Sequence, residues 1–226
     1  MVINNIEKFL DWVLTKQLSL SYIASKHKLR IHDKEEIIGD LWLPFNLSFD
    51  PIANKVTKAE KNWIVLLVRA GTAAVGYFEE GINTEHKVFR AYMVRKKQGK
   101  SQIKYLKTKG KSRAGSRVRL GASEKFFEDI NNKISQYLNN YPIDYIAYSC
   151  SKTLWPFLFS AEGSFKKDDP RLFKVPQHVQ EPGYEKLLKI NDFLQCSNLV
   201  IEEKYPDYFS SYIDIESPEQ EDNDDW

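Results

Sequence analysis

The sequence predicts a mixed α/β fold, in which a mixed β-sheet is covered by helices. Apolar and β-branched runs follow one another from residue 62 to residue 97, which is typical of neighbouring strands. Beyond residue 120 the spacing of apolar positions becomes that of a helix, then of a strand, then of a second helix. With 226 residues, of which 42% are hydrophobic, the chain can bury a core of this kind.

The chain is expected to open with an amphipathic helix. Residues 3–18 place apolar side chains such as Phe9 and Val13 on one stripe at helical spacing. Residues 19–60 mix short apolar groups with prolines and polar runs, so short elements and turns are expected there. Residues 1–61 are therefore interpreted as a helical N-terminal extension of the main domain.

Three strands are expected next. Residues 63–68 form a continuous apolar run that ends before Gly71, and residues 72–78 follow at hairpin distance. Residues 87–97 read as a third strand. This strand would carry a long loop, residues 97–120, at its C-terminal end.

A second helix and later elements complete the predicted domain. Ser123 is positioned to cap a helix that ends before Pro142. Apolar residues recur through this helix at helical spacing and are interpreted as core contacts: Phe126, Phe127, Ile130, Ile134, Tyr137 and Leu138. Residues 143–149 predict another buried strand, and residues 184–194 predict a later helix. Residues 62–200 are therefore expected to form one α/β domain.

The last segment of the chain is strongly acidic. Residues 202–226 hold ten Asp or Glu residues against Lys204 alone. Such a composition cannot bury enough apolar surface to order itself, so residues 201–226 are expected to form a disordered tail. Two roles remain open for it: a plain solubilising tail, or an intramolecular mask for a basic loop.

Cysteine and histidine usage predicts neither a metal site nor a cofactor. Cys150 and Cys196 are lone thiols without a Cys-x-x-Cys pattern, and the four histidines are scattered. At the end of an apolar strand, a reduced and buried Cys150 is favoured over a catalytic thiol. No apolar run approaches the roughly 20 residues of a membrane span, and the first residues lack a secretory-signal pattern. We therefore expect a cytoplasmic protein without a cofactor or a membrane partner.

A basic stretch is the strongest functional signal. Between His86 and Arg119 the chain carries thirteen Lys or Arg residues and no Asp or Glu, although its net charge is only +2. A run of this density repels itself unless a polyanion or solvent neutralises it. Lys-rich stretches are often solvated loops without a ligand. Here Val88 and Phe89 anchor the start of the stretch in a strand, which favours a loop that reaches a nucleic acid.

Several segments resemble one family. Residues 87–102 are similar to the strand and catalytic loop of the Vms-like release factor family, relatives of eukaryotic peptide chain release factors. Residues 111–115, Lys-Ser-Arg-Ala-Gly, resemble that family's Lys-Ser-Ala-Gly element with one residue inserted, and Arg119 falls near its Leu-Arg-Arg segment. Residues 169–171, Asp-Pro-Arg, resemble a downstream motif. Each motif is short, but they follow in the family's order and span well over half the chain.

The resemblance implies an RNase H-like core similar to the middle domain of release factors. It implies a monomer that acts on peptidyl-tRNA at the large ribosomal subunit when translation stalls. The reaction would be hydrolysis of the peptidyl ester or cleavage of the tRNA near its CCA end. The catalytic residue would be Gln102, on a loop that also holds Gly99, Lys100 and Ser101. The surrounding residues would hold the tRNA backbone: Arg95, Lys96, Lys97, Lys111, Ser112, Arg113 and Arg119.

The proposed chemistry of Gln102 follows from its amide. An amide is a poor general base, but it can orient a water or hydroxyl and stabilise developing charge. Classical release factors have Gly-Gly-Gln, whereas Lys100 and Ser101 precede Gln102 here, so the freedom of paired glycines is missing. Gln98 is the rival glutamine, beside the end of the strand. Without the resemblance, Gln102 would be interpreted as a surface amide.

Two other classes of function remain open. The same loop would serve a non-catalytic module that binds tRNA or rRNA in ribosome quality control. A metal-dependent nuclease would need carboxylates to hold magnesium, and the expected strands show no convincing Asp/Glu cluster. Replacement of Gln102 tests the first alternative. Activity on free tRNA in excess EDTA would exclude the second.

Overall fold

The structure is a computed structural model that describes three stretches of the chain: residues 1–91, 112–160 and 166–212. For residues 112–123 and 160 it describes the backbone alone. The chain divides into two compact units. Residues 61–191 form one of them, and residues 1–60 together with the chain from residue 192 onward form the other.

The unit of residues 61–191 is built on a five-stranded mixed sheet with the order β9-β8-β7-β10-β11. Its strands are β7 (Asn62–Arg69), β8 (Thr72–Glu79), β9 (Ile82–Arg90), β10 (Tyr145–Cys150) and β11 (Leu172–Lys174). β8 pairs antiparallel with β7 and β9, whereas β10 pairs parallel with β7 and β11. β8, the second strand of this unit in chain order, is therefore the one strand of the sheet that runs in the opposite direction. Counted in chain order within the unit, the strands lie side by side in the order third, second, first, fourth, fifth. This is the RNase H-like arrangement that the resemblance implies.

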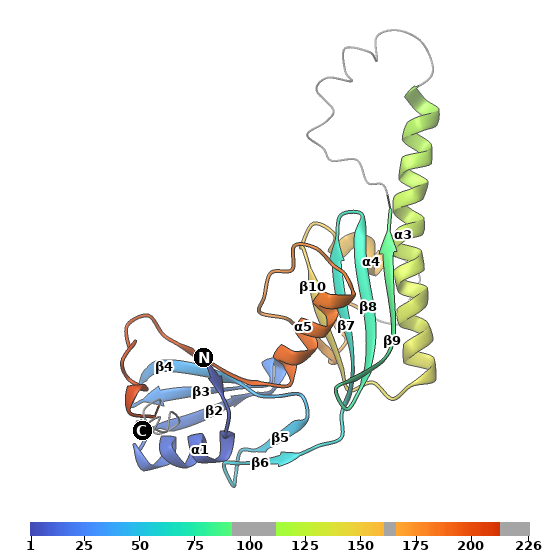
Figure 1. Cartoon of the computed structure of the whole chain (residues 1–226). Coiled ribbons are helices and arrows are strands. Elements are labelled where there is room, and N and C mark those ends of the chain that lie inside the picture. The colour runs from blue at the N-terminus through green and yellow to red at the C-terminus, as the bar shows by residue number, and fades with distance from the viewer. Residues whose placement is uncertain (92–111, 161–165, 213–226) are drawn as a thin grey trace, which may run out of the picture. The chain divides into compact units, whose positions relative to one another are not determined.

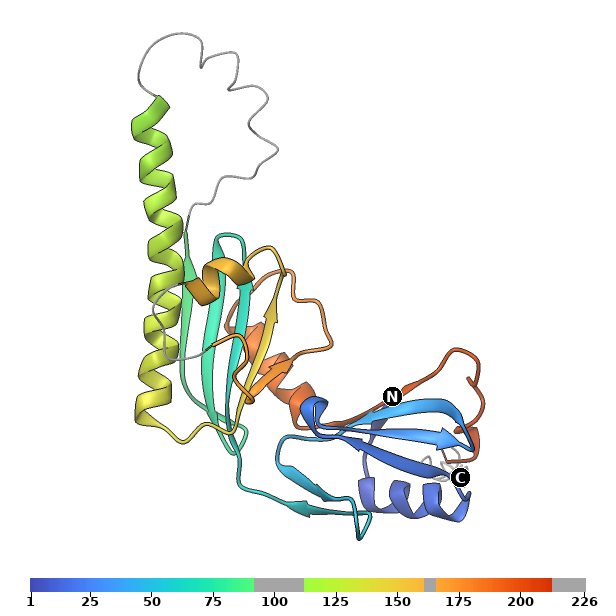
Figure 2. The same ribbon diagram turned by 180° about the vertical axis from the view of Figure 1, so that it is seen from behind.

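Helices cover both faces of this sheet, as Figures 1 and 2 show. The long helix α3 (Ser112–Asn140) and the short α4 (Trp155–Ser160) lie on one face, and α5 (Tyr184–Leu194) begins on the other. The central strands β7 and β8 are therefore buried along almost their whole length. This burial on both faces explains why their sequences are continuous apolar runs rather than alternating ones.

The two faces of the sheet pack against their helices in different ways. On the first face, Phe126, Ile130 and Ile134 of α3 belong to a buried cluster with the apolar residues of the strands, which confirms the core interpretation of the helix stripe. On the second face, a Cβ atom at Gly76 would lie 2.9 Å from Cε2 of Phe78 and 3.3 Å from Cδ1 of Leu187. Glycine in β8 thus allows α5 to approach the sheet.

Helix α3 begins at Ser112, well before the expected cap at Ser123. The helix therefore includes Ser112, Arg113 and Arg119, which the sequence placed in a loop. Ala and Arg supply five of the twelve residues from Ser112 to Ser123, and both favour a helix. Gly115 and Gly121 interrupt the pattern in the sequence, and a glycine costs about 1 kcal/mol in a helix interior, which explains why the early start was missed.

The second unit contains a five-stranded antiparallel sheet with the order β1-β12-β4-β3-β2. Its strands are β1 (Val2–Ile3), β2 (Ser19–Ile23), β3 (Lys28–Asp33), β4 (Glu36–Trp42) and β12 (Ser197–Ile201). Its other elements are the helix α1 (Ile6–Thr15), the turn η1 (Ala24–Lys26) and the hairpin β5 (Leu47–Asp50) to β6 (Lys55–Lys58).

An aromatic cluster forms the core of this unit. The ring of Phe9 in α1 lies 5.0 Å from that of Tyr212 and 6.1 Å from that of Phe209, measured between centroids. All three side chains are buried. Asn5 begins α1 because its side chain accepts a hydrogen bond from the backbone N–H of Lys8 at 2.9 Å.

This unit differs from the expected division of the chain. Helix α1 lies where the apolar stripe predicted it, but residues 19–60 form strands rather than a helical extension. β4 pairs with β12, whose Leu199 lies opposite Leu41, and such a distant partner leaves no local signal. Residues 201–212, which the sequence assigned to the disordered acidic tail, belong to this unit, and Phe209 is buried in its core. Residues 213–226 lie outside the described residues.

Candidate nucleic-acid interface

The basic stretch leaves the sheet at the end of β9 and returns at the start of α3 (Figure 1). The strand ends at Arg90, and the next N–H group, of Ala91, still donates to the carbonyl of Gly71 at 2.9 Å. Four strands run in the same direction, so β7, β9, β10 and β11 all end at this edge of the sheet. The stretch therefore starts at the edge where most carboxyl ends of the strands meet.

Most of the predicted site residues lie outside the described residues. These are Arg95, Lys96, Lys97, Gly99, Lys100, Ser101, Gln102 and Lys111. The other three, Ser112, Arg113 and Arg119, lie in the first turns of α3, where the backbone alone is described. The structure thus places the two stems of the predicted loop, and the roles of these residues remain predictions.

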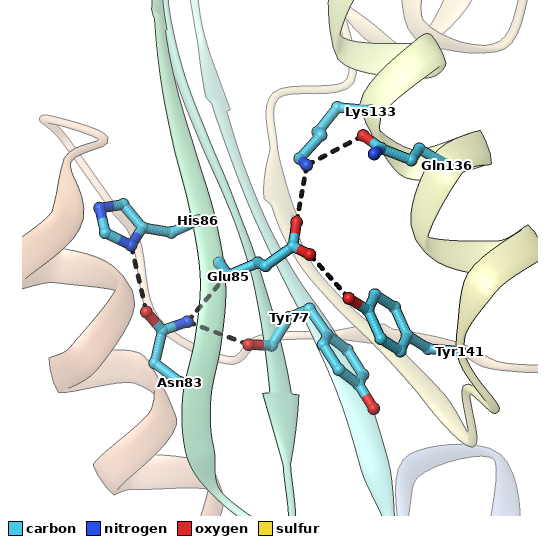
Figure 3. A network of polar contacts seen from close by, with 7 residues as sticks. All are labelled: Tyr77, Asn83, Glu85, His86, Lys133, Gln136 and Tyr141. Atoms are coloured by element: carbon cyan, nitrogen blue, oxygen red, sulfur yellow. Dashed lines mark hydrogen bonds and ion pairs between the residues drawn. The ribbon is translucent and has the colours of Figure 1, made fainter.

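A charged cluster ties β9 to the C-terminal part of α3. One carboxylate oxygen of Glu85 in β9 accepts a hydrogen bond from the hydroxyl of Tyr141 at 2.7 Å. The other lies 2.9 Å from Nζ of Lys133 in α3, which also donates to Gln136 (Figure 3). The hydrogen bonds from Tyr141 and then Lys133 lower the pKa of Glu85 below its ordinary value. We call Glu85, Lys133 and Tyr141 the Glu85 cluster.

Side chains on the opposite face of β9 also contact neighbouring elements. Asn83 sits where the register between β8 and β9 shifts, and its amide donates to the carbonyls of Tyr77 and Glu85, each at 3.0 Å (Figure 3). The ring of His86 stacks on that of Tyr184 in α5 with 3.9 Å between centroids. Contacts on both faces fix the strand from which the basic stretch begins.

Helix α3 is anchored by buried contacts along its second half. Ile130 is fully buried, and so is Tyr137. The amide of Asn131, which is 2% exposed, donates to the backbone carbonyl of Leu158 at 2.9 Å and links α3 to α4. The second half of α3 is therefore part of the core of this unit.

A hollow at the carboxyl ends of β7, β10 and β11 was not anticipated from the sequence. It consists of two adjoining cavities of about 450 and 400 Å³, and both are lined by Cys150, Lys152 and Lys174. The larger is walled by Tyr148 and Trp155, together with Phe159 and Lys167. The smaller has polar walls that include Arg69, Ser149, Gln177 and His178. We call the two cavities together the strand-end pocket.

The strand-end pocket is rich in unpaired positive charge. Arg69, Lys152, Lys167 and Lys174 line it, and among the described residues none of these four forms an ion pair with a carboxylate. Nη2 of Arg69 lies 2.5 Å from Nε2 of His178. Because a guanidinium can only donate, this imidazole nitrogen is the acceptor. No carboxylate is among the described residues that line the pocket.

Cys150 lies inside this pocket but is not an activated thiol. Burial raises the pKa of the Cys150 thiol to about 11, although the charge of Arg69 acts in the opposite direction. A thiol of this kind is protonated near neutral pH and is a weak nucleophile. This agrees with the interpretation of a reduced thiol, although the side chain is half-buried rather than fully buried.

Asp169 has a structural explanation. Its carboxylate accepts hydrogen bonds from the backbone N–H and the guanidinium of Arg171, the latter at 2.7 Å, and so closes the turn before β11. Hydrogen bonding from Arg171 lowers the pKa of Asp169 although burial opposes it. Within the described stretches, no group of three or more His, Cys, Asp or Glu side chains is placed to hold a metal ion. Nor is any helix there both long and apolar enough to cross a membrane.

The strand order β9-β8-β7-β10-β11, with β8 alone reversed, defines an α/β protein with an RNase H-like sheet that carries a basic insertion between β9 and α3. The chain belongs to the Bacteroidetes VLRF1 release factor family, whose sequence model matches residues 63–201, more than half of the chain. A search of curated proteins finds no match. A solved structure described as "Vms1 mitochondrial localization core" is similar, with 13% sequence identity over 87% of this chain and 94% of that chain and a TM-score of 0.49.

Proposed function

We propose that this protein is a ribosome-associated release factor that frees nascent peptides from peptidyl-tRNA on stalled large subunits. The observation that carries the proposal is the family match over residues 63–201, which includes the whole basic stretch and both of its stems. The bond broken is the peptidyl ester or a phosphodiester near the CCA end of the tRNA. Gln102 is the catalytic residue in either reaction.

Positioning supplies much of the rate in this proposal. The amide of Gln102 orients the attacking water or hydroxyl and stabilises the charge that develops on the oxyanion or phosphorane. Arg95, Lys96, Lys97 and Lys111 hold the tRNA backbone through charge-assisted contacts, so binding weakens as salt rises. The Glu85 cluster supports this function because it fixes the strand and the helix between which the stretch is held.

The decisive experiment compares two glutamines of the same stretch. Large subunits carrying labelled peptidyl-tRNA are incubated with wild type, Gln102→Ala and Gln98→Ala, and both the released peptide and the tRNA 3′ end are sized. Loss of one stabilising amide is expected to slow release by roughly 100-fold or more in Gln102→Ala. Gln98→Ala, the matched control, should retain activity. The sizes of the products identify which bond is broken.

A different outcome would favour the non-catalytic alternative. If neither wild type nor Gln102→Ala releases peptide, the chain acts as a tRNA- or rRNA-binding module. If Gln102→Ala releases peptide as fast as wild type, Gln102 is not the catalytic residue. Binding of labelled tRNA by both variants, measured alongside, separates a lost catalytic group from a lost fold. An assay on free tRNA in excess EDTA tests the metal-dependent nuclease, because such an enzyme would stop without its divalent ions.

A further inference from the structure

We propose that the strand-end pocket binds one nucleotide of a single-stranded RNA segment. In this arrangement the phosphate lies against Lys152, Lys174 and Arg69, and the base lies in the aromatic cavity. The choice of RNA as the ligand rests on the proposed function. The pocket itself is built from described residues of one unit and does not depend on the basic stretch.

The linings of the two cavities match the two parts of a nucleotide, the base and the sugar-phosphate. The larger cavity has aromatic walls, and Trp155 is held edge-on by Tyr148 and Phe159, at centroid distances of 5.4 and 5.5 Å. Aromatic surfaces of this kind accept the faces of unstacked bases. The smaller cavity has a larger share of polar lining than the other and suits a sugar and a phosphate. Lys152 and Lys174 line both cavities and so lie at the junction between the base and the phosphate.

Unpaired charge identifies the ligand as an anion. Elsewhere in the described structure, cations that are buried or packed against the core are paired with carboxylates in several places, as Lys28 is with Asp40 and Lys133 is with Glu85. In the strand-end pocket, the half-buried Arg69 and the exposed Lys152 and Lys174 have no carboxylate partner among the described residues. Lys167, also exposed, has none either, and its ammonium lies 5.7 Å from the centroid of the Trp155 ring. Like charges that converge without a counter-charge destabilise the fold unless an anion is bound. A phosphodiester supplies that charge, and it binds guanidinium and ammonium groups through charge-assisted hydrogen bonds.

The position of the pocket suits the RNA that the basic stretch would bind. Both features lie at the carboxyl edge of the sheet, where open α/β folds commonly bind ligands. β10 and β9 are separated by β7 and β8, so the two strand ends are about 14 Å apart at the usual spacing of strands. A single strand that leaves the basic stretch can therefore reach the pocket within a few nucleotides.

The test uses a fluorescein-labelled single-stranded oligoribonucleotide that carries one 4-thiouridine, and the full chain. Lys152→Ala/Lys174→Ala is expected to weaken binding on the order of tenfold and to reduce the slope of log K against log salt by roughly 1.4. Lys55→Ala/Lys58→Ala removes the same charge from exposed positions in the other unit and should change neither quantity. Lys152→Arg/Lys174→Arg should keep the binding of wild type.

Photo-crosslinking locates the base. Crosslinks of the 4-thiouridine, mapped by mass spectrometry, should include the segment of Tyr148 to Phe159 and should be lost there in Lys152→Ala/Lys174→Ala. Binding of a matching RNA duplex should be affected no more by this variant than by the control. The proposal is overturned if the pocket variant binds single strands like the control, if it loses duplex binding equally, or if no crosslink falls in the pocket.

The same variants separate this inference from the proposed function. If Gln102→Ala loses release while Lys152→Ala/Lys174→Ala binds RNA normally, the release-factor proposal stands and the pocket does not. If Gln102→Ala retains release while the pocket variant loses RNA binding, the pocket stands and the catalytic role of Gln102 does not.

Discussion

Glu85 and Lys133 form an ion pair between β9 and α3, whereas Lys152 and Lys174 at the ends of β10 and β11 contact no carboxylate among the described residues. Both regions belong to the same sheet and carry strong charge. In the Glu85 cluster, each charge finds its partner inside the fold, and the pair helps to fix two elements. In the strand-end pocket, the charges remain available to a ligand.

The difference teaches how to distinguish a supporting charge from a binding charge. A paired group lowers the free energy of the folded state, so its removal destabilises the protein. An unpaired cation among other cations has the opposite effect, because its removal relieves repulsion while it weakens the binding of an anion. The two regions should therefore respond to substitution in opposite ways.

The largest effect is expected from the apolar contacts that support the first region. Ile130→Ala in α3 removes a fully buried side chain and should lower the free energy of unfolding by ~2–5 kcal/mol, because it leaves a cavity in the core. Ile52→Ala makes the same change at a position that is 94% exposed and should have almost no effect. Chemical denaturation measures both. Equal stabilities would mean that α3 is not anchored as described.

A smaller effect with a defined pH dependence is expected from Glu85→Gln. The side chain of Glu85 is 38% exposed, so solvent screens the pair and the loss should be only roughly 2–4 °C in Tm at neutral pH. The pKa of Glu85 is lowered in the folded state, so its contribution is present above the unfolded pKa and disappears as pH falls through the lowered folded value. The difference in Tm should therefore shrink as the pH falls below the ordinary pKa of a glutamate and vanish once the pH is below the lowered folded pKa.

Glu128→Gln is the matched control for this measurement, since Glu128 is an exposed residue of α3, the helix that carries the Lys133 partner of Glu85. Its Tm should follow that of wild type at every pH. A difference between Glu85→Gln and wild type that persists unchanged in acid would contradict a role for the charge of Glu85.

The smallest effect on stability is expected in the second region. Lys152→Ala/Lys174→Ala should leave the free energy of unfolding unchanged within ~0.5 kcal/mol, or raise Tm slightly, because the substitution removes no internal partner. Arg171→Ala provides the contrast. It deprives Asp169 of its partner and should lower Tm. Thermal unfolding of the three proteins in low salt measures this, and a marked loss of stability in the lysine variant would show that these charges are paired.

Much of the first region was predictable from the sequence, and little of the second. The apolar stripe with Phe126 and Ile130 has a helical period that the chain itself displays, and the core confirms it. The partner of Glu85 was not predictable, because Lys133 and Tyr141 lie 48 and 56 residues away. The early start of α3 was missed because glycines interrupt its first turns.

In the other unit, residues 19–60 show again that pairing with distant residues cannot be predicted from a local sequence pattern. Their strands are short, and β4 finds its second neighbour only in β12, near the other end of the chain. No local pattern encodes a partner at that separation. Likewise, Phe209 lies in an acidic segment whose composition predicts disorder, but α1 and the sheet provide a core in which it is buried.

The sequence by itself determined the features that are local in the chain: the basic stretch without carboxylates, the family motifs and the helical stripes. The tertiary structure alone decided which distant residues meet, and above all that Arg69, Cys150 and Lys174 line one pocket. The physical reason is that parallel strands are joined by long connections. Their carboxyl ends come together only when the sheet forms, and the register that aligns them depends on pairing across the whole unit.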